Sequence, residues 1–191
     1  GVFGEVNIAL QDNLELTLGA RWYDIAVDLE GSANGAYGNK GADIDPGGGG
    51  ANLSVQYGPN NPNGYPDKAE TDGVIGKATL SWNPDDDILY YLTWSEGFRP
   101  GLLNRPAGVS SGSYTIPAVT DTDEVTNFEF GWKATLMDGA LRFNGSAFMV
   151  DITGLQSTIF DAAIVNLFFS DNAADAEIAG LEGDFVYVNG N

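Results

Sequence analysis

The sequence predicts an all-β fold, an antiparallel meander of about eight strands of the kind that forms a transmembrane β-barrel. Three observations predict this class. Apolar and polar residues alternate with a period of two, several polar sides carry a charge in mid-strand, and short connections alternate with long ones. Helix signals are weak, because 26 Gly and 8 Pro residues interrupt nearly every segment.

The expected strands follow one another from the N-terminus, separated by connections rich in Gly, Asn and Asp. They cover residues 2–10, 14–30, 73–82, 88–96, 125–136, 141–152, a segment near 156–169, and 178–188. The alternation is clearest in three of them. One face of these three strands is expected to carry the apolar residues Leu14, Leu16, Leu18, Phe128, Phe130, Trp132, Leu141 and Phe143. These side chains are predicted to face lipid.

Alternation alone is also typical of a soluble sandwich, but three further features favour a membrane barrel. The strands approach the roughly 9–11 residues that cross a bilayer. Trp22, Trp82 and Trp94 stand near strand ends on the apolar side, where an interfacial aromatic girdle belongs. The mid-strand charges are Arg21, Lys77, Glu129, Lys133 and Arg142. Such charges are compatible with a wet lumen.

The connections predict which strand ends share a rim. Residues 11–13, 83–87 and 137–139 are tight turns, with Gly139 able to take a positive φ. Long links cover 31–72, 97–124 and a stretch around 153–177 that can hold a further hairpin. Short turns on one side and long loops on the other are typical of outer-membrane barrels.

Composition excludes several function classes. The chain has no His and no Cys, so Ser-His-Asp and Cys-His catalysis and His- or thiolate-ligated metal sites are impossible within it. The net charge of −19 argues against nucleic-acid binding, which needs a basic surface. No apolar run approaches the roughly 20 residues of a membrane-spanning helix. No cofactor or metal is predicted: Asp85–Asp87 indicates a solvated turn, and Asp43, Asp45, Asp121, Asp123 and Glu124 form weak cation sites at best.

Three stretches resemble consecutive strands of the TonB-dependent receptor barrel. They run from Tyr91 to Gly101 with Asn104 and Pro106 following, from Glu124 to Gln156, and from Asn172 to Asp184. The opening residues 2–6 and 14–23 are similar to the hairpin that precedes them in that family. Glu96 and Phe128 depart from the family, which often has a basic residue and a Tyr there.

The resemblance implies that residues 1–191 are a partial barrel domain within a larger barrel of roughly 22 strands. The plug, the TonB box and the C-terminal strands are expected to lie outside this chain. It further implies a multi-pass protein of the bacterial outer membrane, in contact with lipid and lipopolysaccharide. Such a protein imports a scarce solute with energy from the TonB–ExbB–ExbD complex and is not an enzyme. A ferric siderophore is the usual cargo, and haem, cobalamin and glycans are alternatives.

Other functions stay open at this point. A complete eight-stranded barrel with a structural or adhesion role is the main alternative, and a secreted glycan-binding sandwich is another. An outer-membrane hydrolase would need carboxylate or Ser-Lys chemistry, and no carboxylate pair is singled out by spacing.

Two groups of candidate site residues are predicted. Arg99, Asn104 and Arg105 form a candidate substrate-binding group in an outward loop, since Arg binds carboxylate or phosphate through two points. A solvated loop or a lipopolysaccharide contact is the alternative role for the two arginines. The second group is a lumen polar network that braces the barrel against its plug, with direct substrate contact as the alternative. Its members are Arg21, Glu129, Lys133, Arg142 and Asn144.

Overall fold

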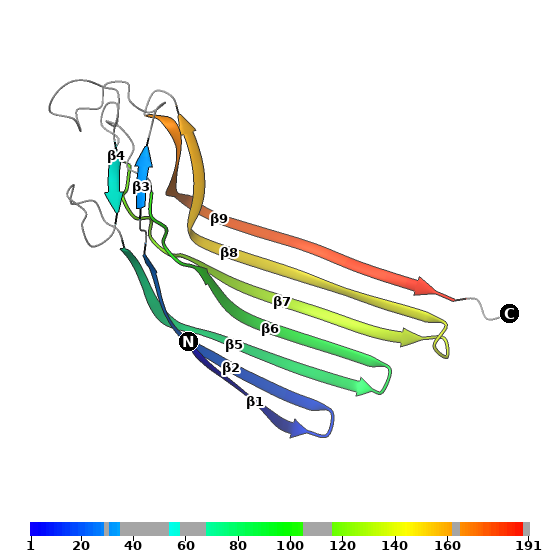
Figure 1. Cartoon of the computed structure of the whole chain (residues 1–191). Coiled ribbons are helices and arrows are strands. Elements are labelled where there is room, and N and C mark those ends of the chain that lie inside the picture. The colour runs from blue at the N-terminus through cyan, green and yellow to red at the C-terminus, as the bar shows by residue number, and fades with distance from the viewer. Residues whose placement is uncertain (29–30, 35–53, 58–67, 105–115, 162–164, 189–191) are drawn as a thin grey trace.

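A computed structural model describes residues 1–28, 31–34, 54–57, 68–104, 116–161 and 165–188. Its main sheet is an antiparallel meander in the order β1-β2-β5-β6-β7-β8-β9 (Figure 1). The strands of this sheet are β1 (Val2–Gln11), β2 (Leu14–Asp28), β5 (Lys68–Asp85), β6 (Ile88–Arg99), β7 (Asp123–Leu136), β8 (Leu141–Asp161) and β9 (Val165–Tyr187). A separate pair joins β3 (Gly31–Asn34) to β4 (Ser54–Tyr57). The described part of the chain contains no helix long and apolar enough to cross a membrane.

The predicted all-β meander is confirmed, but the separate strand near 156–169 is wrong. β8 continues through that region to Asp161, and β9 already begins at Val165, so 156–169 contains the end of the β8–β9 hairpin. The continuation depends on a bulge, because the β8–β9 register shifts between Ile152 and Gln156 and Gly154 takes a φ of +65°. The main sheet therefore has seven strands.

The predicted sidedness is confirmed for the described residues. The turns after β1, β5 and β7 lie at one end of the sheet (Figure 1). The opposite end, where β2 and β6 finish and β5 and β7 begin, is called the outer end of the wall from here on. At the β7–β8 turn Gly139 has the expected positive φ of 88°, and Met137 and Asp138 are also left-handed. The Asp87 N–H donates to the Asp85 carboxylate at 2.9 Å, which closes the β5–β6 turn.

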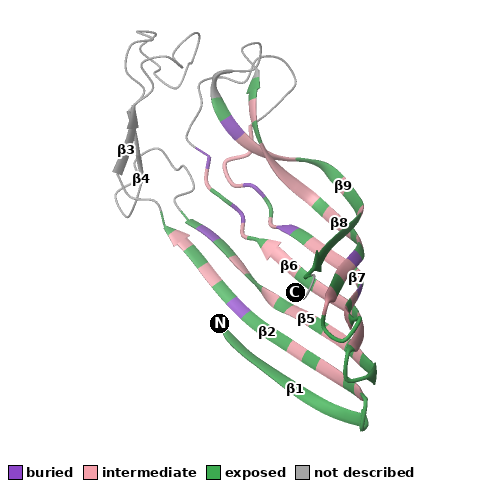
Figure 2. Ribbon diagram, turned by 90° about the vertical axis from the view of Figure 1, so that its right-hand side faces the viewer, coloured by how far each residue is buried: buried purple, intermediate pink, exposed green. Residues whose placement is uncertain are grey.

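The sheet is curved and has two different faces (Figure 2). On its outer face one row of directly paired residues crosses all seven strands and is apolar throughout. This row consists of Ile8, Leu16, Leu80, Leu92, Phe130, Ala147 and Leu181. The adjacent inner row is mostly polar and consists of Asn7, Thr17, Thr79, Thr93, Glu129, Phe148 and Gly180.

No second sheet covers the outer face in the described part of the structure. Leu92 is 55% exposed and Phe130 is 45% exposed, and among the described residues only Tyr23, Ala69 and Phe169 are buried apolar residues. A soluble sandwich would bury these rows in a core. The apolar band ends at the Trp94–Phe128 pair, because the next outer-face pair is Glu96 and Thr126. The strand ends beyond that pair lie outside the band.

Aromatic side chains pack against one another on the outer face of the sheet. Near the short turns a row of rings crosses β5 to β8, with centroid distances of 5.8 Å for Trp82–Tyr90, 6.2 Å for Tyr90–Phe130 and 5.7 Å for Trp132–Phe143. Of the three Trp residues expected in a girdle, this row includes Trp82, whereas Trp22 and Trp94 lie toward the other end of the strands. A ring also lies close over Gly145, where a Cβ would be 2.2 Å from the Trp132 ring.

Candidate functional site

The inner face places a hydrogen-bonded carboxylate at the centre of the wall. The Tyr91 hydroxyl donates to Glu129 Oε1 at 2.6 Å, from the neighbouring strand. Tyr91 reaches Glu129 by lying across Gly131, where a Cβ would be only 2.1 Å from the Tyr91 Cζ atom. The local sequence Glu129-Phe130-Gly131 therefore supplies an inward carboxylate, an outward ring and a gap for the neighbouring Tyr.

Two more carboxylates lie beside Glu129 in a groove of about 330 Å³ on the inner face. The Ser146 hydroxyl donates to Glu182 at 3.4 Å, and the Asn144 amide donates to Asp184 at 3.3 Å. Each of these pairs is also a direct partner pair in the β8–β9 ladder. Within the described residues no Lys or Arg forms an ion pair with these carboxylates. The groove can therefore accept cationic or hydrogen-bond-donating groups.

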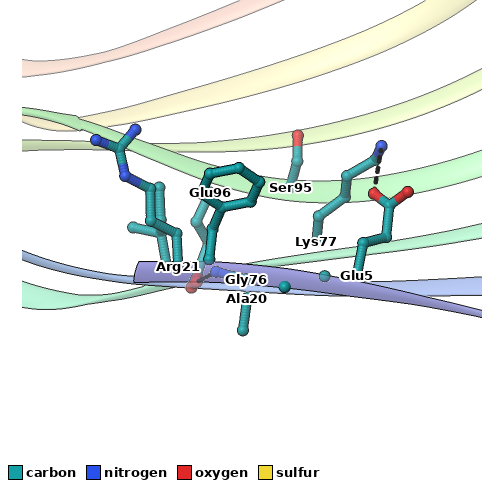
Figure 3. A pocket seen from close by; sticks show the side chains of 11 residues that line it. Glu5, Ala20, Arg21, Gly76, Lys77, Ser95 and Glu96 are labelled. Carbon is teal, nitrogen blue, oxygen red and sulfur yellow. Dashed lines mark hydrogen bonds and ion pairs between the residues drawn. The ribbon is translucent and has the colours of Figure 1, made fainter. Parts of the chain in front are cut away.

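A second inner groove, of about 360 Å³, lies over β1, β2 and β5 (Figure 3). Lys77 Nζ lies 3.6 Å from Glu5 Oε2, and the two residues flank Gly19 in the ladder. Figure 3 shows Arg21 pointing to the same side as Lys77 and Glu5, whereas Ala20 points away. This groove is lined by two cations, Arg21 and Lys77, and two carboxylates, Glu5 and Glu96, so its charge is mixed and it differs from the acidic groove.

All five residues of the predicted lumen network lie on the inner face, but they do not form one connected network. Glu129 and Asn144 have the partners given above. Arg21, Lys133 and Arg142 make no hydrogen bond or ion pair with another described residue. Their role against a plug stays a prediction. Glu182 and Asp184 were missed as members of this site, although the alternation of β9 places both on the polar side.

At the outer end of the wall, beyond the apolar band, Arg99 is bound by Asp123. Asp123 is fully buried and accepts bonds from Arg99 Nε at 2.8 Å, from the Arg99 N–H at 3.1 Å and from the Gln156 N–H at 3.2 Å. The Arg99 Nη2 group completes the ion pair. Burial alone would raise the pKa of Asp123, but these hydrogen bonds and the guanidinium charge outweigh it and hold the pKa below its ordinary value.

Side-chain amides tie the neighbouring strand ends to this pair. Gln156 Nε2 donates to the carbonyls of Pro100 and Asp121, both at 3.0 Å. Asn104 is 7% exposed, and its amide donates to the Ser170 carbonyl at 2.6 Å and accepts from the Ser170 N–H at 2.8 Å. The outer ends of β6, β7, β8 and β9 are thereby held together.

The predicted substrate-binding residues differ in their placement. The side chain of Arg99 is 55% exposed despite its pairing, and its Nη1 group makes no hydrogen bond to a described residue. Asn104 is buried, and Arg105 lies outside the described residues. Ligand contact by these three residues stays a prediction. Asp123 and Gln156 were missed as partners because they lie 24 and 57 positions from Arg99, so no local pattern indicates them.

The curved open wall, its uncovered apolar face and its charged inner face define the class of an outer-membrane-type β-barrel. A family model described as "TonB dependent receptor-like, beta-barrel" matches residues 1–191, so the chain belongs to this family of receptors. The family is one of outer-membrane transport receptors, which are not enzymes. In the described part no group of three or more Asp or Glu residues could hold a metal ion.

Solved structures of similar fold include three uptake proteins. The ferric yersiniabactin uptake receptor FyuA from Yersinia pestis has a TM-score of 0.62 and 16% identity, with 96% of this chain and 23% of that chain covered. The FrpB iron transporter from Neisseria meningitidis has a TM-score of 0.59 and 17% identity, with 98% and 23% covered. The copper transporter OprC has a TM-score of 0.66 and 14% identity, with 97% and 26% covered.

The chain thus spans about a quarter of the length of these structures. At such identities the likeness shows the fold alone. A search of curated proteins found no significant match.

Proposed function

We propose that the protein containing this wall lies in the bacterial outer membrane and imports a ferric siderophore, with energy from the TonB–ExbB–ExbD complex. The observation that carries the proposal is the contrast between the wall's two faces. The outer face is apolar and uncovered, which suits lipid and the acyl chains of lipopolysaccharide. The inner face is charged, which suits a wide aqueous interior. A wide barrel leaks unless it is plugged, and opening a plug needs work that the outer membrane itself cannot supply.

Iron is favoured over copper by the ligands that this segment offers. Copper sites select thiolate, thioether and imidazole ligands. The chain has no Cys or His, and of its two Met residues, Met137 lies in a short turn and Met149 is paired with Phe128 on the outer face. Among the similar structures, FyuA takes up a ferric siderophore and FrpB is an iron transporter. Haem, cobalamin and glycans are the competing cargoes.

In this proposal the substrate-binding group lies at the outer rim. Arg99 is held by buried Asp123 while leaving part of its guanidinium exposed, which suits an arginine that binds an anionic group of a chelate. Asn104 fixes the segment between Arg99 and Arg105 through Ser170, and Arg105 adds a second cation. Arg99→Gln is expected to weaken cargo binding while Lys68→Gln, a more distant cation of the outer end, leaves it unchanged.

The acidic inner groove is proposed to receive basic side chains of the plug. Glu129 and Glu182 have hydroxyl partners but no cation among the described residues. Glu129→Gln together with Glu182→Gln should loosen the plug and raise the entry of a large antibiotic such as vancomycin. Glu15→Gln, an exposed inner-face carboxylate near a short turn, is the control. Equal entry in both variants would argue against this role.

The transport proposal is tested by measuring uptake of radiolabelled iron chelates in cells with and without the gene, and with and without TonB. Loss of uptake of at least one chelate in both deletions supports the proposal. Unchanged uptake of every iron chelate, with lost growth on a glycan or cobalamin, would reject iron and keep the class. Uptake that ignores the loss of TonB would reject the class.

A further inference from the structure

The ladder between β5 and β6 is shorter than either strand. β5 pairs with the whole length of β2, from Lys68 to Trp82, and β6 pairs with β7 as far as Arg99. Between β5 and β6, however, pairing ends at Lys77 and Ser95. Beyond this point the wall divides into a β2–β5 ribbon and a β6–β9 ribbon (Figure 2).

A side chain takes the place of the next ladder bond. Gly76 and Glu96 would form the next pair, but the Gly76 N–H donates to the Glu96 carboxylate at 2.8 Å. The carboxylate satisfies a backbone donor that would otherwise face the split. Glu96 is also the residue that departs from the basic residue expected from the family resemblance.

Two further contacts bridge the split. The Tyr23 ring of β2 lies over Gly73 of β5 and stacks on Phe98 of β6, with centroids 3.6 Å apart and planes 12° apart. Only a glycine fits at Gly73, because a Cβ would lie 2.6 Å from the Tyr23 hydroxyl oxygen. The hydroxyls of Thr71 and Thr122 lie 3.1 Å apart. We call the three contacts Gly76–Glu96, Tyr23–Phe98 and Thr71–Thr122 the clasp.

A small cavity lies inside the split. Its volume is about 80 Å³, and its lining includes Val74 from one ribbon and Val125 from the other. Ile75 and Glu96 line both this cavity and the mixed-charge groove of Figure 3, so the two spaces adjoin at the split. A space of this size is not filled by side chains, and the ribbons are therefore not packed into one core there.

The two ribbons are restrained very differently. The outer ends of β6 to β9 are tied by buried Asp123, by Gln156 and by Asn104. Among the described residues, the outer part of the β2–β5 ribbon contacts the outer ends of β6 to β9 through the clasp. Segments held by few contacts open at low free energy.

From this geometry we propose that the outer part of the β2–β5 ribbon is a hinged flap of the barrel wall. It turns at Lys77 and Ser95, where the ladder ends, and the clasp holds it closed beside the mixed-charge groove of Figure 3. Opening separates Tyr23 from Phe98 and joins the cavity to that groove, while the β6–β9 ribbon stays in place.

The experiment uses two pairs of spin labels in the intact protein in lipid vesicles, since this chain has no cysteine of its own. Thr71→Cys with Thr122→Cys reports on the split. Thr79→Cys with Thr93→Cys is a matched control, because its hydroxyls lie 3.0 Å apart within the paired ladder. Each pair is measured with Phe98 intact and with Phe98→Ala. The 71/122 pair itself replaces the Thr71–Thr122 contact in both samples, so the two samples differ only in the Phe98 ring.

Phe98→Ala is expected to move the 71/122 distance distribution to longer values and to leave the 79/93 distribution narrow and unchanged. The unchanged control also shows that the variant is folded. A 71/122 distribution that is the same with and without the Phe98 ring would overturn the flap. The measurement needs no cargo, so its outcome is independent of the transport proposal.

Discussion

The membrane-crossing part of the wall and its outer end are held together by different forces. Across the apolar band the strands are joined by continuous backbone ladders, and rings lie over glycines of the next strand. At the outer end the β5–β6 ladder stops. There the carboxylates of Asp123 and Glu96 accept hydrogen bonds from the backbone N–H groups of Arg99 and Gly76. The structure of the apolar band therefore follows from the periodicity of the strands, whereas the structure of the outer end depends on individual side chains.

The largest expected effect comes from reversing the polarity of the outer face. Phe130→Arg should lower the free energy of unfolding from lipid vesicles by about 2–4 kcal/mol if Phe130 lies near the bilayer midplane. Asn127→Arg places the same side chain on the inner face, where charge is tolerated, and is expected to cost far less. Urea titration in vesicles measures both. Equal costs would show that the two faces do not differ in environment.

A smaller effect is expected from adding one methyl group beneath a ring. Gly131→Ala should lower the free energy of unfolding by about 1–3 kcal/mol, because its Cβ would lie 2.1 Å from Tyr91 Cζ. Gly4→Ala is the control, since a Cβ there meets nothing within 4 Å. Adding Tyr91→Ala to Gly131→Ala should recover part of the loss. A double variant no more stable than the sum of its parts would contradict the packing argument.

At the outer end, Asp123→Asn should lower the free energy of unfolding by about 1 kcal/mol at neutral pH. The effect is small because the partner, Arg99, is half exposed. The folded pKa of Asp123 is lowered, so its stabilisation is complete above the ordinary carboxyl pKa of about 3.9 and is lost as the pH falls through the lower folded value. The difference between wild type and Asp123→Asn should therefore shrink only in that acidic range. Asp121→Asn, at an exposed position of the same segment, is the matched control.

The smallest effect is expected for the Glu5–Lys77 pair. Both side chains are about half exposed and their charged atoms are 3.6 Å apart, so Lys77→Met should change the free energy of unfolding by roughly 0–1 kcal/mol. High salt should abolish whatever difference exists. A larger, salt-independent loss would mean that Lys77 has a structural partner beyond Glu5.

The sequence predicted the membrane-crossing part well, because its information is local. Alternation assigned Phe130 to one face and Glu129 to the other, and the glycine of the β7–β8 turn was expected to take positive φ. The same local pattern was misleading at Thr153 and Gly154, where a bulge continues β8 instead of ending it.

The outer end could not be predicted because its contacts join residues that are distant in sequence. Asp123 accepts hydrogen bonds from Arg99, 24 positions away, and Asn104 donates a hydrogen bond to Ser170, 66 positions away. Neither pair has a spacing or a residue type that singles it out. The acidic groove could be predicted in part. The alternation of β9 places Glu182 and Asp184 on the inner face, but that they share a groove with Glu129 depends on which strands pair.

The central claim, that this sheet is the wall of a membrane barrel, is tested most directly along β7. Single cysteines placed at positions 127 to 133 carry spin labels, and their accessibility to molecular oxygen is measured in lipid vesicles. Accessibility should alternate, with high values at 128, 130 and 132 and low values at 127, 129, 131 and 133, because oxygen concentrates in lipid and only the even positions face it. Uniform accessibility along the strand, or high values at the odd positions, would contradict the account.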